Sequence, residues 1–384
     1  MSPFHLGFAI VWNRDGDRAR TWSHTPWSLW EALERRDDVL IHDVPVVIPK
    51  VADFAGRLLA ARIVKGRPWT SWSLRPTYAR FARHALKSSI TRAGAIDAVL
   101  SIGDNGPADK PLYLYQDYSF GHALESFRQT HQMPVGWEHF PVHALERRAA
   151  MQAQTYASSA GVFTMSKWNA DFLVRSGLVH STRVHVVHCG INVPVEAPSD
   201  IAFEHKRSRD ERVLLFAGRD FYRKGGDLVL QSFEHAKRIS SRPLRLVVAG
   251  PKSWPMSGPV PEHVHFIGDA SFGTLREHMR NADAMVMPSR FEAFGIVFAE
   301  ALAAGTPVIG RNAFAMPEMI ENGRNGYLIE DDDTIALAEL MVRVVEDDEM
   351  AWHCRRDSEN IAAKFSWNRV AADMISVMKA SHES

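Results

Sequence analysis

The 384-residue sequence is poor in several features that would assign it to a class of protein at once. Its two cysteines, Cys189 and Cys354, are too few for a disulfide framework and fit a reducing compartment. We expect a cytoplasmic location, which includes the inner face of the membrane. No run approaches the roughly 20 apolar residues of a membrane-spanning helix. Lys plus Arg equals Asp plus Glu at 45 each, so the overall charge predicts no nucleic-acid partner.

Glycine-rich nucleotide motifs are missing as well. The sequence has neither the Gly-x-Gly-x-x-Gly fingerprint of dinucleotide-binding folds nor a P-loop, which argues against a nicotinamide oxidoreductase. The length favours two domains, and 46% hydrophobic residues suffice for two cores. Buried strand patterns alternate with amphipathic helix patterns in both halves, which predicts an α/β fold. A charged, proline-containing stretch over Val193–Asp210 is typical of a linker.

One stretch in the second half, Pro288–Gly310, carries most of the chemical information. Its pattern predicts the end of a buried strand, a loop, a helix opened by a glycine and a further strand. Glu292 lies in the loop and Glu300 lies in the helix, so both can face the carboxyl end of the sheet, where open α/β sheets bind ligands. The helix start suits a phosphate, because its backbone N–H groups carry partial positive charge; these belong to Phe294, Gly295 and Ile296.

A second strand-to-helix turn, Gly218–Gly226, follows the buried strand predicted over Arg212–Ala217. It contains Arg219 and Lys224, and a helix is expected from Asp227 onward. Two fixed cations beside a helix N-terminus are suited to a diphosphate group. Surface cations on an ordinary loop are the alternative interpretation.

The segment PSRFEAFGIVFAEALAAGTPVI is similar to the E-x7-E signature of retaining GT-B glycosyltransferases of the family 4 group. The resemblance is strong from about Arg212 to Ile329 and only topological before Val184. It implies two Rossmann-like domains facing a cleft, with a C-terminal helix that crosses back to the first domain. The implied boundaries are an acceptor-binding domain at 1–193 with 366–384, and a donor-binding domain at 194–365.

The same resemblance implies a reaction: a hexosyl unit moves, with retention, from a nucleoside diphosphate sugar to a saccharide or lipid-linked acceptor, in cell-surface glycan or glycoconjugate biosynthesis. Arg219 and Lys224 would hold the diphosphate without a metal ion, and no cofactor is expected. Glu292 would bind hydroxyls of the donor sugar and Glu300 those of the ribose. The remaining donor-site candidates are the three strand-end glycines and the helix start, namely Gly218, Gly250, Gly268, Phe294, Gly295 and Ile296.

The first half departs from the family pattern in two places. The loop after the first strand lacks the usual paired glycines, so His24 and Thr25 at the following helix entrance are the candidates for phosphate or acceptor contact. Thr25 as a simple helix cap is an equally good interpretation. Asp117 stands where many relatives carry a histidine, with His122 nearby. A carboxylate there could bind an acceptor hydroxyl or could only cap the next turn.

A basic segment runs from Arg57 to Arg92, with nine cations and no acidic residue. A helix over Thr77–Thr91 would place Arg80, Arg83, His84 and Lys87 on one face and Tyr78, Phe81, Ala82 and Ala85 on the other, with Trp69 and Trp72 just upstream. Such a face beside aromatic residues predicts peripheral contact with anionic lipid or with a phosphorylated acceptor. A solvated helix face is the alternative.

Two other functions fit the same fold. A nucleotide-sugar epimerase uses the same kind of cleft, and a nucleotide-binding module without catalysis needs only the nucleotide site. Nucleotide release with and without a saccharide acceptor separates the three. The base, the sugar, the acceptor and the oligomeric state are not predicted.

Overall fold

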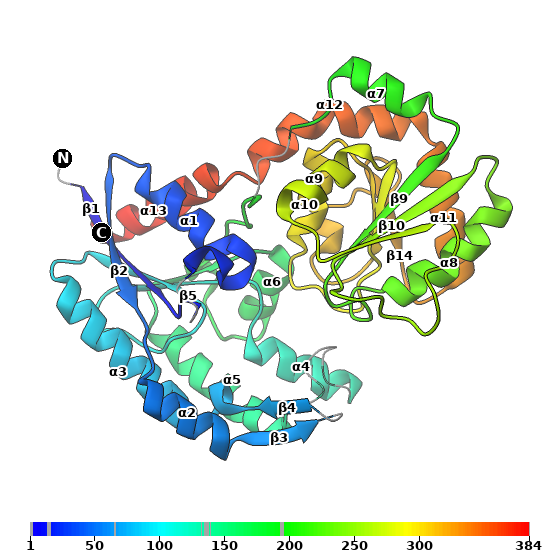
Figure 1. Cartoon of the computed structure of the whole chain (residues 1–384). Coiled ribbons are helices and arrows are strands. Elements are labelled where there is room, and N and C mark those ends of the chain that lie inside the picture. Colours follow the sequence, from blue (N-terminus) through cyan, green and yellow to red (C-terminus); the bar gives the residue numbers. More distant parts are fainter. Residues whose placement is uncertain are drawn as a thin grey trace. The chain divides into compact units, whose positions relative to one another are not determined.

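The computed structural model describes residues 3–13, 17–64, 67–131, 133, 138, 140–192 and 196–383. The chain divides into two compact units, each with its own sheet and helices (Figure 1). Unit 1 comprises Met1–Asn192 and Trp367–Ser384, and unit 2 comprises Val193–Ser366. The predicted boundary between 193 and 194 lies outside the described residues, and the one between 365 and 366 is one residue before the observed division.

Unit 1 contains a six-stranded sheet whose strands are all parallel. Its order is β2 (Val39–Pro45), β1 (Phe4–Ile10), β5 (Ala98–Ile102), β6 (Leu112–Gln116), β7 (Gly161–Thr164) and β8 (Val184–Val186). Strands β5, β6 and β7 are buried along their whole length, as expected for a parallel sheet covered on both faces. The connecting helices are α1 (Thr25–Glu34), α3 (Pro76–Ala93), α4 (Phe120–Thr130), α5 (Val142–Ser158) and α6 (Lys167–Arg175).

Besides α4, three further elements of unit 1 are absent from the predictions. They are helix α2 (Lys50–Leu59) and an antiparallel hairpin of β3 (Ala61–Val64) and β4 (Arg67–Thr70). Part of the loop predicted between β1 and α1 is also ordered, as the 3₁₀ helix η1 (Arg18–His24). Short 3₁₀ turns η2 (Trp72–Leu74) and η3 (Ser181–Arg183) complete the unit.

Unit 2 repeats the same architecture with a second parallel sheet of six strands. Its order is β11 (Val264–Gly268), β10 (Leu244–Ala249), β9 (Arg212–Ala217), β12 (Ala284–Val286), β13 (Val308–Arg311) and β14 (Gly326–Ile329). The helices are α7 (Asp200–Arg207), α8 (Gly226–Ile239), α9 (Phe272–Asn281), α10 (Ile296–Ala303), α11 (Thr334–Glu346) and α12 (Asp348–Lys364), with a 3₁₀ turn η4 at Met316–Glu318.

The final helix, α13 (Trp367–Glu383), belongs to unit 1 although the preceding helix belongs to unit 2. The Trp367 ring packs so closely on Gly190 that a Cβ there would lie 2.4 Å from it. Trp367 also donates to the Asn192 amide oxygen at 3.1 Å, and Lys379 pairs with Asp38 at 2.7 Å. The predicted C-terminal helix is therefore confirmed.

The predicted linker is wrong in part, because α7 forms within it. Ser199 caps this helix by accepting from the Ala202 N–H, and the Phe203 ring is fully buried. Lys206 lies buried with its ammonium donating to the Ala282 carbonyl at 3.0 Å. This helix is stabilised by side chains that contact a distant part of the chain. Its short, charged sequence gives no indication of these contacts.

None of the helices in the described ranges is both long enough and apolar enough to cross a membrane.

Candidate active site

The chain changes direction across the sheet of unit 2 at the centre of that sheet. From β9 it proceeds outward through β10 to β11, and from there it returns to the other side of β9, through β12 to β14. Adjacent parallel strands whose connections run in opposite directions leave a crevice beyond their carboxyl ends. The two predicted loops, 218–225 after β9 and 287–295 after β12, both leave the sheet at this point.

Lys224 and Glu292 meet at this end of the sheet, although 68 positions separate them in the sequence. The Lys224 ammonium contacts a carboxylate oxygen of Glu292, and the two side chains are only 14% and 11% exposed. Burial lowers the pKa of the Lys224 ammonium to about 7, with the nearby Arg223 charge acting in the same direction. The nearby Asp220 charge opposes this shift, because an opposite charge favours the charged amine. The site thus holds a largely desolvated ion pair.

Three predicted glycines bring the backbone of adjacent strand ends together beside this pair. A Cβ on Gly218 would lie 2.9 Å from the Lys224 side chain, and one on Gly250 would lie 2.5 Å from the Gly218 carbonyl carbon. Gly250 has a φ of +117°, which side-chain-bearing residues rarely adopt. Its N–H donates to the Gly268 carbonyl at 2.7 Å. The strand ends of β9, β10 and β11 therefore lie close together.

The start of α10 lies directly beside Glu292. Gly295 precedes the helix in the left-handed conformation, with a φ of 87°, and a Cβ there would lie 3.0 Å from the Glu292 Cγ. Phe294 is buried against the Phe365 ring, whereas Ile296 is half-buried at the first helical position. Glu300 is on the same helix and is nearly buried. The helix N-terminus thus faces the region of the Lys224–Glu292 pair.

Arginine residues that were not predicted fix the loop that carries Glu292. Arg290 donates to both carboxylate oxygens of Asp227, at 2.7 and 3.0 Å, and to Asp332 at 2.8 Å. Such bidentate pairing determines orientation as well as attraction. The sequence gave one indication that Arg290 positions this loop, because Arg290 lies two residues before Glu292 in the stretch Pro288–Gly310.

Two other arginines hold the backbone of this loop. Arg311 donates to the Ser289 carbonyl at 3.1 Å, and Arg223 donates to the Phe291 carbonyl at 3.0 Å. Both arginines come from other elements, so the sequence around Glu292 gives no hint of them. The loop is therefore held from the helix α8 side and from the β13 side.

Arg219 differs from the prediction of two fixed cations. Its side chain is 69% exposed, and its nearest acidic group is Asp269 at 3.5 Å. An exposed arginine keeps its hydration and its rotamer freedom, so it is not held in place as Lys224 is. Of the predicted clamp, only Lys224 is fixed by its surroundings in unit 2.

The candidates of unit 1 lie at the carboxyl ends of its own strands. His24 has a φ of 77° and precedes α1, and Thr25 is buried at the helix start, where its hydroxyl accepts from the Asn192 amide at 3.3 Å. Asp117 follows β6 directly and is half-buried. Burial raises the pKa of the Asp117 carboxyl, while backbone N–H groups of Asp117 and Tyr118 act against the rise. Thr25 therefore has a structural partner, and Asp117 is a desolvated acid.

His122 does not share the environment of Asp117. Its ring is buried and stacks on Phe172, with centroids 4.2 Å apart, and it also contacts Trp168. Burial lowers the pKa of His122 to about 4. This histidine is a neutral member of an aromatic cluster near neutral pH.

The basic segment is partly as predicted. Helix α3 exposes Arg80, Arg83, His84 and Lys87, but Phe81 is also exposed rather than buried on the opposite face. The helix turns Ala82, Leu86, Ser89 and Ile90 inward instead. Trp72 is buried, so it cannot serve as a surface aromatic group. Lys65 lies outside the described residues.

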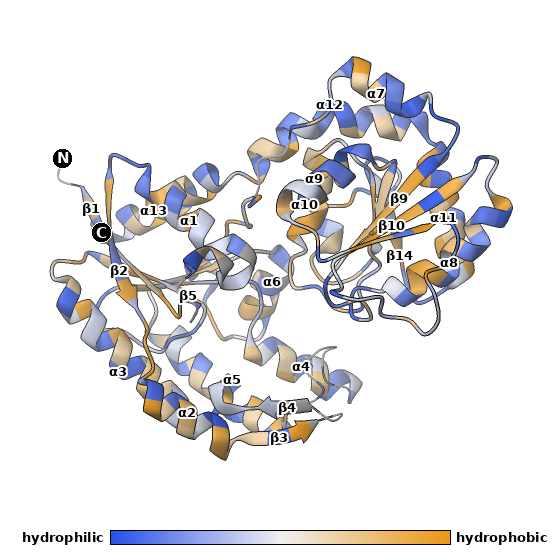
Figure 2. Cartoon of the chain, viewed as in Figure 1, coloured by the Kyte–Doolittle hydropathy of each residue, from blue (hydrophilic) through white to orange (hydrophobic). Residues whose placement is uncertain are grey.

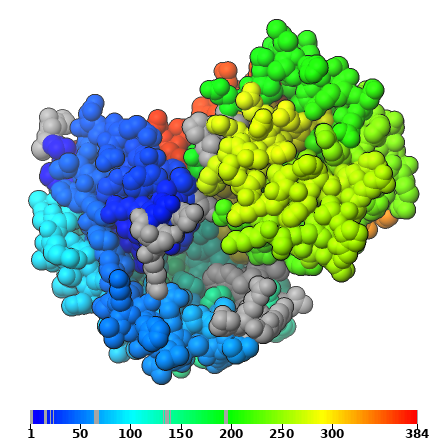
Figure 3. Space-filling view, in the orientation of Figure 1, coloured from blue at the N-terminus to red at the C-terminus, as the bar shows by residue number. Residues whose placement is uncertain are grey.

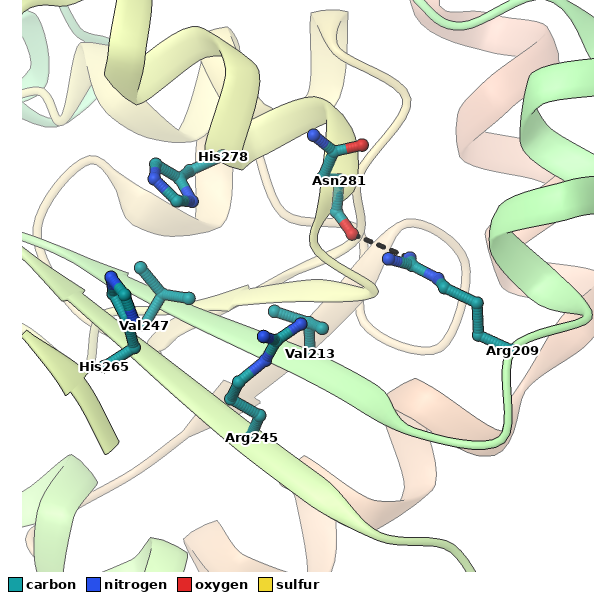
Figure 4. A pocket seen from close by; sticks show the side chains of 7 residues that line it. All are labelled: Arg209, Val213, Arg245, Val247, His265, His278 and Asn281. Atoms are coloured by element: carbon teal, nitrogen blue, oxygen red, sulfur yellow. Dashed lines mark hydrogen bonds between the residues drawn. The ribbon is translucent and has the colours of Figure 1, made fainter. Parts of the chain in front are cut away.

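A cavity of about 350 Å³ in unit 2 lies away from these candidates (Figure 4). It is lined by Arg209, Val213, Arg245, Val247, His265, His278 and Asn281. Val213 and Arg245 are near the beginnings of β9 and β10, whereas the glycines described above lie at the ends of these strands. Arg209 donates to the Asn281 carbonyl at 2.9 Å across its rim. The cavity therefore does not form part of the candidate site.

The match to a known protein family lies in the second half of the chain. Residues 199–360 match the model of the family described as Glycosyl transferases group 1. An uncharacterized glycosyltransferase of Methanocaldococcus jannaschii is 28% identical over 263 residues, which cover 61% of this chain and 64% of that protein. A D-inositol 3-phosphate glycosyltransferase of Jonesia denitrificans is 27% identical over 261 residues, covering 62% and 61%. The matches thus span less than two thirds of these curated relatives.

Solved structures resemble the whole chain. Sucrose-phosphate synthase from Thermosynechococcus elongatus has a TM-score of 0.69 at 17% identity and covers 98% of both chains. Anabaena HepE in complex with UDP-glucose has a TM-score of 0.60 at 14% identity, covering 97% of this chain and 99% of HepE. The fold is that of the GT-B glycosyltransferases. The predicted α/β architecture with two Rossmann-like domains is thereby confirmed.

Proposed function

We propose that this chain is a retaining glycosyltransferase that transfers a hexosyl unit from a nucleoside diphosphate sugar to a saccharide or lipid-linked acceptor. The observation that carries the proposal is the desolvated Lys224–Glu292 pair beside the start of α10 at the centre of the unit 2 sheet. A buried cation and a helix N-terminus stabilise negative charge that develops on a departing diphosphate. The match of residues 199–360 to a glycosyl transferase family supports the same reaction.

In this proposal unit 2 binds the donor. The diphosphate lies against the α10 N-terminus and shares the Lys224 ammonium with Glu292, while exposed Arg219 closes on it from solvent. The close-packed glycines allow the nucleotide to approach the backbone at the strand ends. Glu292 binds hydroxyls of the donor sugar, and Glu300, farther along α10, binds those of the ribose.

Unit 1 supplies the acceptor site. Asp117 is the candidate for contact with the acceptor hydroxyl, because its raised pKa makes the carboxyl a better proton acceptor once ionised. His24 and Thr25 remain candidates for contact with an acceptor or a phosphate. The charge of the diphosphate is offset by Lys224, Arg219 and the helix dipole, so we propose that no divalent metal is required.

Donor binding is the first test. Thermal shift against UDP-, GDP- and ADP-sugars should find at least one that stabilises the wild-type chain. The Lys224→Met variant should lose most of that shift, whereas Arg245→Met, which alters the cavity at the opposite strand ends, should keep it. If no nucleotide sugar stabilises the wild type, or if Lys224→Met keeps the full shift, the donor site is assigned wrongly.

Group transfer is the second test. Nucleotide release should rise when an acceptor is added, and because inositol phosphate glycosyltransferases are among the relatives, inositol 3-phosphate belongs in the acceptor panel beside simple sugars and polyprenyl phosphate. The anomeric configuration of the product, measured by NMR, should match that of the donor. Isomerisation of the sugar without acceptor would indicate an epimerase, and binding without either reaction would indicate a nucleotide-binding module.

A further inference from the structure

Helix α2 of unit 1 is turned so that its large apolar side chains face outward. Val51, Phe54, Leu58 and Leu59 are 83%, 71%, 67% and 81% exposed, and Ala55 between them is exposed too. These positions follow the spacing i, i+3, i+4, i+7 and i+8, which places them on one stripe of the helix. A surface helix of a globular protein ordinarily turns such a stripe toward the core.

The opposite face explains why α2 is oriented in this way. Gly56 lies against the Trp72 ring so closely that a Cβ would be 2.3 Å from it. Asp53 is buried on the same face and accepts a hydrogen bond from the Trp72 indole N–H at 3.2 Å. Ala60 after the helix end is buried as well. These small and polar contacts fix the helix and leave its apolar stripe outside.

Two further large apolar side chains that flank α2 in the sequence are exposed. Val47 before α2 is 62% exposed, and Ile63 in strand β3 is 75% exposed. Apolar residues colour much of α2 and β3 (Figure 2), and the space-filling view shows this part of the chain at the surface of unit 1 (Figure 3). Scattered apolar residues are normal on a protein surface, whereas a contiguous patch marks a binding surface.

Cations accompany this patch, and Asp53, the acidic residue of α2, is buried. Lys50 and Arg62 are exposed, and neither has an acidic partner among the described residues. Arg57 lies at the edge of the stripe and pairs with Asp53. From there to Asp97 the sequence has nine cations and no acid, in a chain whose formal net charge is zero. An apolar stripe with cations at its margin is complementary to an anionic bilayer surface.

We propose that α2 and the adjoining β3 dock on a lipid bilayer that carries anionic headgroups. The side chains of the stripe enter the boundary between headgroups and acyl chains, and Lys50 and Arg62 contact the headgroups. This differs from contact through the basic face of α3, where Arg80, Arg83 and Lys87 would bind headgroups by charge. The apolar part makes binding persist at salt concentrations that screen exposed charges.

The test is sedimentation of the full chain with vesicles of phosphatidylcholine and phosphatidylglycerol across a salt series, without donor. The double variant Phe54→Ser with Leu58→Ser should partition at least about tenfold less than wild type, because two exposed apolar side chains no longer enter the bilayer. Ile201→Ser is the matched control, since Ile201 on α7 is 81% exposed but lies outside the patch. It should bind as wild type does. Pure phosphatidylcholine vesicles should bind less protein.

Three outcomes would overturn the proposal. If the wild type does not sediment with vesicles at low salt, α2 and β3 do not form a lipid-docking surface. If the Phe54/Leu58 variant still binds vesicles, and a variant with Arg80, Arg83 and Lys87 changed to Ser does not, the membrane contact lies on α3. If the wild type self-associates without binding vesicles, and the Phe54/Leu58 variant no longer self-associates, a second copy of the chain occupies the patch. None of these outcomes bears on the donor site, because donor binding is measured separately.

Discussion

Lys224→Met offers the sharpest test of the candidate site, because it removes the cation while retaining most of the apolar stem. In the wild type the Lys224 ammonium contacts the Glu292 carboxylate, and both side chains are largely shielded from water. Removing one partner of a buried pair leaves an uncompensated charge, which costs on the order of 3–5 kcal/mol. Since burial lowers the pKa of Lys224, the charged ammonium is less stable in the fold than in water, so we expect the lower end of that range.

A loss of about 3 kcal/mol should lower the melting temperature by about 6–12 °C for a domain of this size. Nucleotide binding should weaken independently of stability. A hydrogen bond to a charged group contributes about 1.5–3 kcal/mol, so the Kd for the nucleoside diphosphate should rise roughly 10- to 150-fold. Arg219→Ala should have a smaller effect, about fivefold, because this side chain is solvated.

The double variant Lys224→Met with Glu292→Gln separates the two effects. It removes the buried carboxylate charge as well, so it should recover much of the lost melting temperature but none of the nucleotide affinity. Calorimetry for binding and differential scanning fluorimetry for stability provide the two readouts. If the stability losses of the single variants simply add in the double variant, the two groups are not coupled. If a folded Lys224→Met protein binds the nucleotide as wild type does, Lys224 does not hold the diphosphate.

Further predictions concern the glutamates, metal ions and pH. Glu292→Gln should lower turnover while nucleotide diphosphate affinity is kept, whereas Glu300→Gln should weaken the free nucleotide too; the reverse pattern in calorimetry would show that their roles are exchanged. Activity should persist in excess EDTA, and a loss that manganese restores would contradict this. Affinity for the intact donor should fall as pH rises through about 7, because deprotonation of Lys224 removes the positive charge; a Kd that stays flat in this range would oppose the assignment. The folded pKa of His122 is about 4, below the usual 6.5, so the unfolded chain binds more protons between these values. Unfolding free energy should therefore decrease by up to about 3 kcal/mol as pH falls from 6.5 to 4, and His122→Phe should reduce that decrease; an equally steep fall in the variant would exclude His122 as its source.

Local sequence determined the elements that carry the candidate site. The strand predicted over Arg212–Ala217 has those bounds in the structure, because an uninterrupted apolar run between charged turns permits little else in a parallel sheet. The helix expected after Gly295 begins at Ile296, since only glycine adopts the preceding left-handed conformation readily. Glu292 and Glu300 could be singled out because their spacing lies within one strand–loop–helix unit.

Tertiary structure alone decided which of these residues act together. Lys224 meets Glu292, and Arg290 meets Asp227, through strand order that no local pattern contains. Arg219 is five residues from Lys224 on the same turn, yet it remains exposed, because burial depends on what packs over a side chain.

The orientation of α2 likewise could not be predicted from the sequence. Its apolar periodicity favours an inward stripe, but the Trp72 ring against Gly56 and the bond from Trp72 to Asp53 turn that stripe outward. Periodicity tells which side chains share a face of a helix, whereas contacts with residues distant in the chain determine where that face points.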